Sequence, residues 1–153
     1  MSQRQPDAEK LSFRIGLSGN YWDRKPEFIV LVNDVELAKG FINGPSGQVQ
    51  YVDFTYEFEE NSSNKLQIRL NNKSDTDVVQ NDDCTEILND MLLNVESIEV
   101  DEIDLGQLLW SHSQFIPDDT SLPTLKNCVN LGWKGTYVLE FTSSFYLWLL
   151  ESM

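Results

Sequence analysis

The clearest strand in the sequence is the segment Val52-Asp53-Phe54-Thr55-Tyr56-Glu57-Phe58-Glu59. Apolar and polar side chains alternate along it, which places its large apolar side chains on one face of a β-strand. The same alternation occurs at residues 11–17, 65–70 and 136–141. Before the last ten residues, no segment shows the 3.6-residue period of an amphipathic helix over a useful length. The sequence therefore predicts an all-β protein.

The segments between these strands indicate how the strands are connected. Residues 28–32 are a continuous apolar run, and Asn33-Asp34 then offers a tight turn into residues 35–37, so this part is predicted to be a hairpin. The apolar pattern of residues 92–105 shifts phase near Ser97, which indicates a β-bulge or a bend. Strands of this number and spacing are typical of an antiparallel β-sandwich or jelly roll.

Length and charge limit the partners. A chain of 153 residues with 41% hydrophobic residues can bury one core, so a single domain (1–153) is expected. The net charge of −14 repels phosphate groups, and no Lys/Arg cluster overcomes it, which argues against nucleic acid and anionic membranes as partners. Residues 1–10 form a polar, flexible N-terminus in this prediction, without the apolar core of a signal peptide. No apolar run approaches the roughly 20 residues of a membrane helix, so we expect synthesis in a cytoplasm without export.

Catalytic motifs are largely missing from the sequence, and we expect a protein that is not an enzyme. His112 is the one histidine, and it is expected to be an exposed loop residue. A polysaccharide hydrolase that uses two of the many carboxylates remains an alternative, as does an acidic protein that binds or inhibits a basic partner. Cys84 and Cys128 are expected to be free thiols, although a disulfide between them stays open.

The most unusual part of the chain is the acidic segment 71–90, NNKSDTDVVQNDDCTEILND, which contains six carboxylates. Calcium binds hard oxygen ligands from Asp, Asn and backbone carbonyls, usually six to eight of them. An EF-hand does not fit, because Gln80 stands where the turn-forming glycine is required and the flanking segments are strand-like. A solvated acidic loop is the competing interpretation. The candidate calcium ligands are Asn71, Asn72, Asp75, Asp77, Asp82, Asp83 and Asp90.

Two segments that flank this loop carry a family resemblance. They are Leu66-Gln67-Ile68-Arg69-Leu70-Asn71-Asn72 and Asp90-Met91-Leu92-Leu93-Asn94-Val95-Glu96-Ser97-Ile98-Glu99-Val100. Together they resemble the calcium-dependent xylan-binding modules, which are small β-sandwich carbohydrate-binding domains. In that family a strand ends in Asn-Asp, a loop follows, and Asp-Arg-Asn-Leu opens the next strand. Asp90 matches the motif, Asn72 stands where the family has Asp, and Met91-Leu92 replace Arg-Asn. The resemblance implies that the loop holds Ca²⁺, which in turn coordinates sugar hydroxyls.

Aromatic residues offer a second type of ligand contact. Tyr21 and Trp22 lie in a polar turn, where large rings are costly to expose, and they are candidate ligand-binding residues that stack on a sugar or a partner. The alternative is that these rings cover the edge of the core.

The C-terminal segment 143–153 is predicted to be a short element that is apolar on every side. Such an element is usually buried, either under its own sandwich or in a neighbouring subunit, and we favour its own core. The segments Leu131-Gly132-Trp133-Lys134-Gly135-Thr136 and Phe145-Tyr146-Leu147-Trp148-Leu149-Leu150-Glu151 also resemble segments of small uncharacterised proteins of tailed phages. This resemblance implies a virion component that assembles with other subunits. The sequence therefore predicts a non-enzymatic binding or structural module. The candidate interface residues are Phe145, Tyr146, Leu147, Trp148, Leu149 and Leu150.

Overall fold

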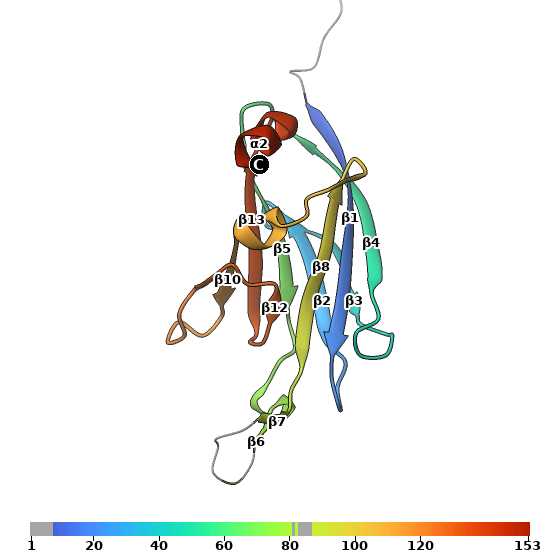
Figure 1. The fold of residues 1–153 in the computed structure, drawn as a ribbon, viewed down its shortest axis with the longest axis vertical. Coiled ribbons are helices and arrows are strands. Elements are labelled where there is room, and N and C mark those ends of the chain that lie inside the picture. The colour runs from blue at the N-terminus through green and yellow to red at the C-terminus, as the bar shows by residue number, and fades with distance from the viewer. Residues whose placement is uncertain (1–7, 81, 83–86) are drawn as a thin grey trace, which may run out of the picture.

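The computed structural model describes residues 8–80, 82 and 87–153, which form an antiparallel β-sandwich (Figure 1). One sheet has the strand order β12-β8-β1-β4, with β9 paired to β8. The other has the order β11-β10-β13-β5-β2-β3, and a small third sheet pairs β6 with β7. Every strand pair in these sheets is antiparallel. The predicted all-β sandwich is therefore confirmed. Among the described residues, no helix is both long and apolar enough to span a membrane.

The elements have the following bounds. The five-stranded sheet contains β1 (Glu9–Asn20), β4 (Gln50–Phe58), β8 (Leu92–Val100), β9 (Ile103–Asp104) and β12 (Asn130–Leu131). The six-stranded sheet contains β2 (Glu27–Val32), β3 (Val35–Phe41), β5 (Ser63–Leu70), β10 (Ser113–Pro117), β11 (Leu125–Lys126) and β13 (Gly135–Thr142). The small sheet contains β6 (Val79–Gln80) and β7 (Ile87–Asn89), and the helices are the 3-10 turn η1 (Asp75–Asp77), α1 (Leu108–Ser111) and α2 (Phe145–Ser152).

The core lies between the two large sheets. Phe13 on β1 contacts Phe141 on β13 with ring centroids 6.4 Å apart, and Phe58 at the end of β4 contacts the same ring at 5.3 Å. Each of these three side chains is at most 4% exposed. Burying one such side chain stabilises a fold by about 1.5–3 kcal/mol. The alternating pattern of the sequence thus places its large apolar residues where the sheets meet.

Two local features follow the sequence as predicted. Asn33 and Asp34 both have positive φ angles, 50° and 68°, and they join β2 to β3 as a tight hairpin turn. On the β1–β8 pair, Gly16 lies opposite Ser97 while Leu17 lies opposite Val95, so one extra residue is inserted in β8. This β-bulge explains the phase shift of the apolar pattern near Ser97.

The structure also differs from the sequence-based prediction at several places. Strand β10 and helix α1 lie between residues 105 and 136, where the sequence pattern predicted no strand or helix. Strand β10 turns Ser113 and Pro117 inward together with Phe115, so it shows no apolar alternation. Strand β1 begins at Glu9, inside the segment 1–10 that was predicted to be flexible. Glu9 Oε1 accepts hydrogen bonds from the Phe145 backbone N–H at 2.9 Å and from the Ser143 hydroxyl, which fixes the strand start to the beginning of α2. Residues 1–7 lie outside the described residues.

Candidate functional site

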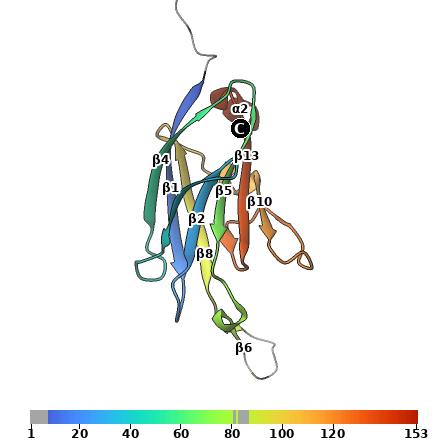
Figure 2. The same ribbon diagram turned by 180° about the vertical axis from the view of Figure 1, so that it is seen from behind.

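Several predicted site residues meet at one end of the sandwich, which we call the loop end. It contains the β1–β2 connection (residues 21–26) and the described residues 71–80, 82 and 87–91, and it lies opposite to helix α2 (Figures 1 and 2). The indole Nε1 of Trp22 donates a hydrogen bond to the backbone oxygen of Asp77 at 2.9 Å. Arg24 donates two hydrogen bonds to the Asp77 carboxylate, at 3.1 and 2.5 Å. The fold therefore brings the predicted aromatic residue and one predicted calcium ligand together.

The Asp77 carboxylate is an internal anchor of the loop end. Its side chain is 3% exposed, and it also accepts a hydrogen bond from the Ser74 backbone N–H at 2.8 Å. Burial acts to raise the pKa of Asp77, but the hydrogen bonds from Arg24 and Ser74 outweigh it and leave this pKa below its ordinary value. The carboxylate is thus ionised at neutral pH and is neutralised by the chain's own arginine.

The depressed pKa values predict how stability depends on pH. Hydrogen bonds from Arg69 lower the pKa of Asp118, and hydrogen bonds from Arg24 and Ser74 lower the pKa of Asp77. Both carboxyl groups therefore bind protons less readily in the folded state than in the unfolded state. Their stabilisation is fully present above the unfolded-state pKa of about 3.9 and is lost as the pH falls through their folded-state values. We expect Asp77→Asn to lower the free energy of unfolding at pH 7 by about 2 kcal/mol and to flatten its decline below pH 4.

Urea unfolding at several pH values checks this expectation. The matched control is Asp53→Asn, because Asp53 is a 66% exposed carboxylate whose contact with Arg14 is a 3.6 Å surface pair. An equally steep decline in acid for Asp77→Asn and the control would contradict the assignment.

A second cation lies buried nearby. The ammonium group of Lys73 donates to Asp90 Oδ1 at 2.5 Å, to the Met91 backbone oxygen at 2.7 Å and to the Gly132 backbone oxygen at 2.8 Å. The Lys73 side chain is 6% exposed, and that of Asp90 is 26% exposed. The three donors of the ammonium are all used by these oxygens.

The described members of the predicted calcium site do not fit a calcium ion. Asp77 and Asp90 already bind Arg24 and Lys73, and the Asn72 side-chain oxygen accepts the Glu27 backbone N–H at 2.9 Å. Across residues 8–80, 82 and 87–153, no group of three or more His, Cys, Asp or Glu side chains could hold a metal ion. Of the remaining predicted ligands, Asn71 uses its side-chain amide to donate a hydrogen bond to Glu27 and to accept one from Arg69. Asp82 is exposed. Asp83 and the side chain of Asp75 lie outside the part of the chain that the structure describes.

The two predicted platform rings have different environments. Tyr21 is half-buried against the core, and its hydroxyl donates to the Gly44 backbone oxygen at 2.6 Å, which suits a ring that covers the core edge. Trp22 is 46% exposed. Its role as a stacking platform stays a prediction. Cys84 lies outside the described residues, so its pairing with Cys128 also stays untested.

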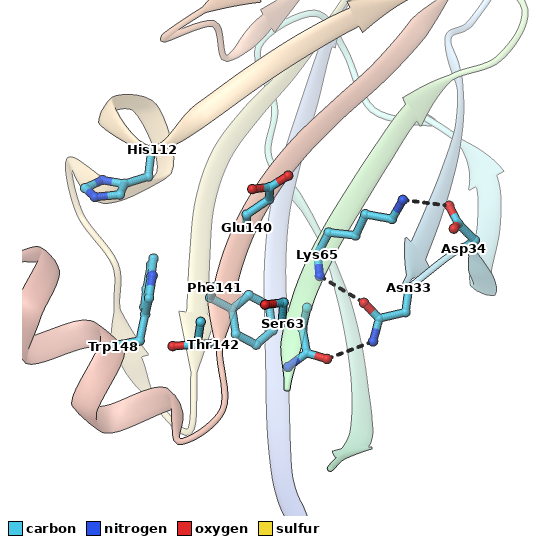
Figure 3. Close-up of a pocket in the computed structure, with 10 residues that line it drawn as sticks. Asn33, Asp34, Ser63, Lys65, His112, Glu140, Phe141, Thr142 and Trp148 are labelled. Carbon is cyan, nitrogen blue, oxygen red and sulfur yellow. Dashed lines mark hydrogen bonds and ion pairs between the residues drawn. The ribbon is translucent and has the colours of Figure 1, made fainter. Parts of the chain in front are cut away.

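The sequence did not indicate a trough on the outer face of the six-stranded sheet, which Figure 3 shows in close-up. It has a volume of about 710 Å³ and an open side. His112 and Trp148 form one wall, Lys65 and Asp34 lie at the other, and Glu140 projects from β13 between them. The rings of His112 and Trp148 meet edge to face, with centroids 5.8 Å apart. As predicted, His112 is exposed, directly after α1.

Polar groups line much of this trough. Lys65 pairs with Asp34 at 3.2 Å, and hydrogen bonds from Gln67 and Lys65 lower the pKa of Asp34, which keeps it ionised. Lys65 and Glu140 are direct partners on the paired strands β5 and β13. Among the described residues that line the trough, none bonds to the Glu140 carboxylate (Figure 3). Its oxygens can therefore accept hydrogen bonds from a ligand.

Helix α2 contributes Trp148 to the trough and divides the predicted interface residues. Phe145 and Leu149 are buried in the chain's own core, at 1% and 9% exposure, and Trp148 is half-buried against it. The segment is therefore not buried on all sides. The prediction that this segment contacts another subunit stays untested, and its exposed members are Tyr146, Leu147 and Leu150.

Comparison with known proteins identifies the fold. No protein-family model matches the chain, and no curated protein matches it. Among solved structures, the chain is similar to vCBM60 in complex with galactobiose, with 11% identity and a TM-score of 0.53 over 84% of this chain and 96% of that one. It is also similar to a selenomethionine form of vCBM60, solved in work on two families of calcium-dependent carbohydrate-binding modules, with 11% identity and a TM-score of 0.52. That match covers 84% of this chain and 89% of the other. The chain thus has the fold of a carbohydrate-binding module.

Proposed function

We propose that the protein is a non-enzymatic carbohydrate-binding module that holds a glycan in the trough on the outer face of its six-stranded sheet. The observation that carries this proposal is that the open Glu140 carboxylate and the ring of Trp148 both line one concave surface of about 710 Å³. Ligand sites typically have volumes of about 300–1,000 Å³ and combine aromatic walls with a few polar groups.

The chemistry of the trough suits sugar hydroxyls and sugar rings. Hydroxyl groups donate to ionised carboxylates, and such bonds contribute about 1.5–3 kcal/mol each. Glu140 supplies an acceptor of this type, and the Lys65 ammonium supplies donors. A sugar ring carries C–H groups that pack on the face of an aromatic ring. Trp148, at one wall of the trough, can supply such a ring. The fold similarity to vCBM60 supports the same class of ligand.

The loop end is a weaker candidate for the glycan. The side chains of Arg24 and Lys73 already occupy Asp77 and Asp90, so a sugar would have to replace strong internal bonds. No step of the proposed binding therefore uses calcium. The role of a virion component and the association with other subunits rest on the sequence alone and remain proposals.

The matched variants Glu140→Ala and Glu57→Ala test the proposal. Glu140 and Glu57 are both exposed strand residues, but Glu57 is on β4 of the opposite sheet. The wild-type protein is first screened against immobilised xylan, galactan and glucan, and affinities for soluble oligosaccharides of the retained polymer are measured by calorimetry. We expect Glu140→Ala to weaken binding about tenfold, since one charged hydrogen bond is lost, and Glu57→Ala to bind normally. Absence of retention on every polymer, or equal affinities of the two variants, would refute the proposal.

A further inference from the structure

The Lys73 ammonium has the surroundings of a bound cation. Its three oxygen partners come from Asp90, Met91 and Gly132, at 2.5–2.8 Å, and its side chain is 6% exposed. Two of these partners are backbone carbonyls and one is a carboxylate, which are ligand types that calcium also takes. A buried lysine with all three donors satisfied by oxygen is unlike the solvated lysines of a protein surface.

The position of these partners shows what the cation connects. Lys73 follows β5, Gly132 lies between β12 and β13, and Asp90 and Met91 precede β8. Strands β5 and β13 belong to the six-stranded sheet, whereas β8 and β12 belong to the five-stranded sheet. The ammonium therefore joins the ends of both sheets at the loop end.

Asp77, whose carboxylate is buried at the loop end, is also paired with a cation of the same chain, the guanidinium group of Arg24. Arg24 also donates to the Asn72 backbone oxygen at 2.6 Å, so the arginine too binds a carboxylate and a carbonyl. The negative charges that would attract a divalent ion at these two positions are each paired with a positive side chain of the same chain.

We propose that Lys73 is the resident cation of the loop end, and that this protein keeps its two sheets joined there without calcium. This distinguishes the chain from the calcium-dependent modules that the sequence resembles. Calcium neither raises the thermal stability of the wild-type protein nor is needed for its folding.

Thermal unfolding tests the proposal with and without calcium. The wild-type protein is treated with EDTA, dialysed, and melted with EDTA or with 5 mM CaCl₂, and calcium binding is measured by titration calorimetry. We expect the same melting temperature in both conditions and no binding heat. A melting temperature that rises with calcium would overturn the proposal, because an ion that binds the folded state and not the unfolded state must stabilise the protein.

A pair of variants tests the role of Lys73 itself. We expect Lys73→Met to lower the melting temperature by about 10 °C, since it leaves Asp90 and two carbonyls partly buried without their cation. The control is Lys39→Met, which changes an exposed lysine on β3 and should shift the melting temperature by no more than about 2 °C. Equal effects of the two variants would overturn the proposal. If Lys73→Met does not fold, the test uses Lys73→Arg, which keeps the charge, and compares it with Lys39→Arg. The larger fall in melting temperature is again expected for the change at position 73. None of these readouts uses a carbohydrate, so they stand or fall separately from the proposed function.

Discussion

Deletion of residues 144–153 is expected to give a chain that does not fold. The deletion removes Phe145 and Leu149, which are 1% and 9% exposed, together with the half-buried Trp148. Phe145 packs edge to face on Phe141, at a centroid distance of 5.9 Å, and Phe141 also contacts Phe13 and Phe58 across the sandwich. Losing a buried leucine or phenylalanine typically costs about 2–5 kcal/mol, against a total stability of about 5–15 kcal/mol. The loss of three large side chains at one end of the core therefore approaches the whole stability of the domain.

Circular dichroism and size-exclusion chromatography measure this outcome. The matched control is Leu147→Ser combined with Leu150→Ser, because these side chains are on the same helix but are 62% and 69% exposed. The double variant should fold with a stability within about 1 kcal/mol of the wild type. If the exposed side of α2 also contacts another subunit, the double variant stays folded but loses that association. A folded truncated chain would show that the sandwich does not depend on α2.

Replacement of Trp148 by alanine is expected to weaken glycan binding at least tenfold. The change removes the aromatic wall of the trough, and truncating a central aromatic contact typically costs 2 kcal/mol or more of binding free energy, where about 1.4 kcal/mol corresponds to a factor of ten. Because Trp148 also packs against Phe141 and Phe145, the melting temperature of the variant should fall as well. Binding is therefore compared only at temperatures at which the variant is folded.

The control for this substitution is Trp110→Ala. Trp110 lies on α1, is 49% exposed and is not among the residues that line the trough. The Trp110→Ala variant should bind the glycan with the affinity of the wild type, as measured by calorimetry with the same oligosaccharide. An affinity of Trp148→Ala equal to that of the wild type would place the glycan elsewhere.

The sequence allowed much of the fold to be predicted, because a period of two assigns each residue of a strand to one face. The inward positions of β1, the Asn33-Asp34 turn and the bulge near Ser97 all follow from patterns within a few residues of each other. Strand β10 was missed since its inward side chains include Ser113 and Pro117, which carry no apolar signal.

The site was harder to predict, because it depends on contacts between distant residues. A lysine in an acidic loop is usually solvated, and only the approach of Met91 and Gly132 shows that Lys73 is buried. Lys65 and Glu140 become neighbours only through the pairing of β5 with β13, 75 positions apart in the chain. The charge of the acidic segment indicated a site there. Lys65 and Glu140 are outward residues of strands β5 and β13, and no sequence pattern distinguishes them from other exposed strand residues.

The most direct test of the proposed glycan site is a titration of the ¹⁵N-labelled protein with the best-binding oligosaccharide, observed through the indole N–H signals of its four tryptophans. Trp148 lies in the trough, Trp22 and Trp133 are near the loop end, and Trp110 is on α1. We predict that the Trp148 signal shifts in proportion to the bound fraction, together with backbone signals of Glu140 and Thr142, while the other three indole signals stay in place. Shifts confined to Trp22 or Trp133, with Trp148 unchanged, would contradict a glycan site on the sheet face.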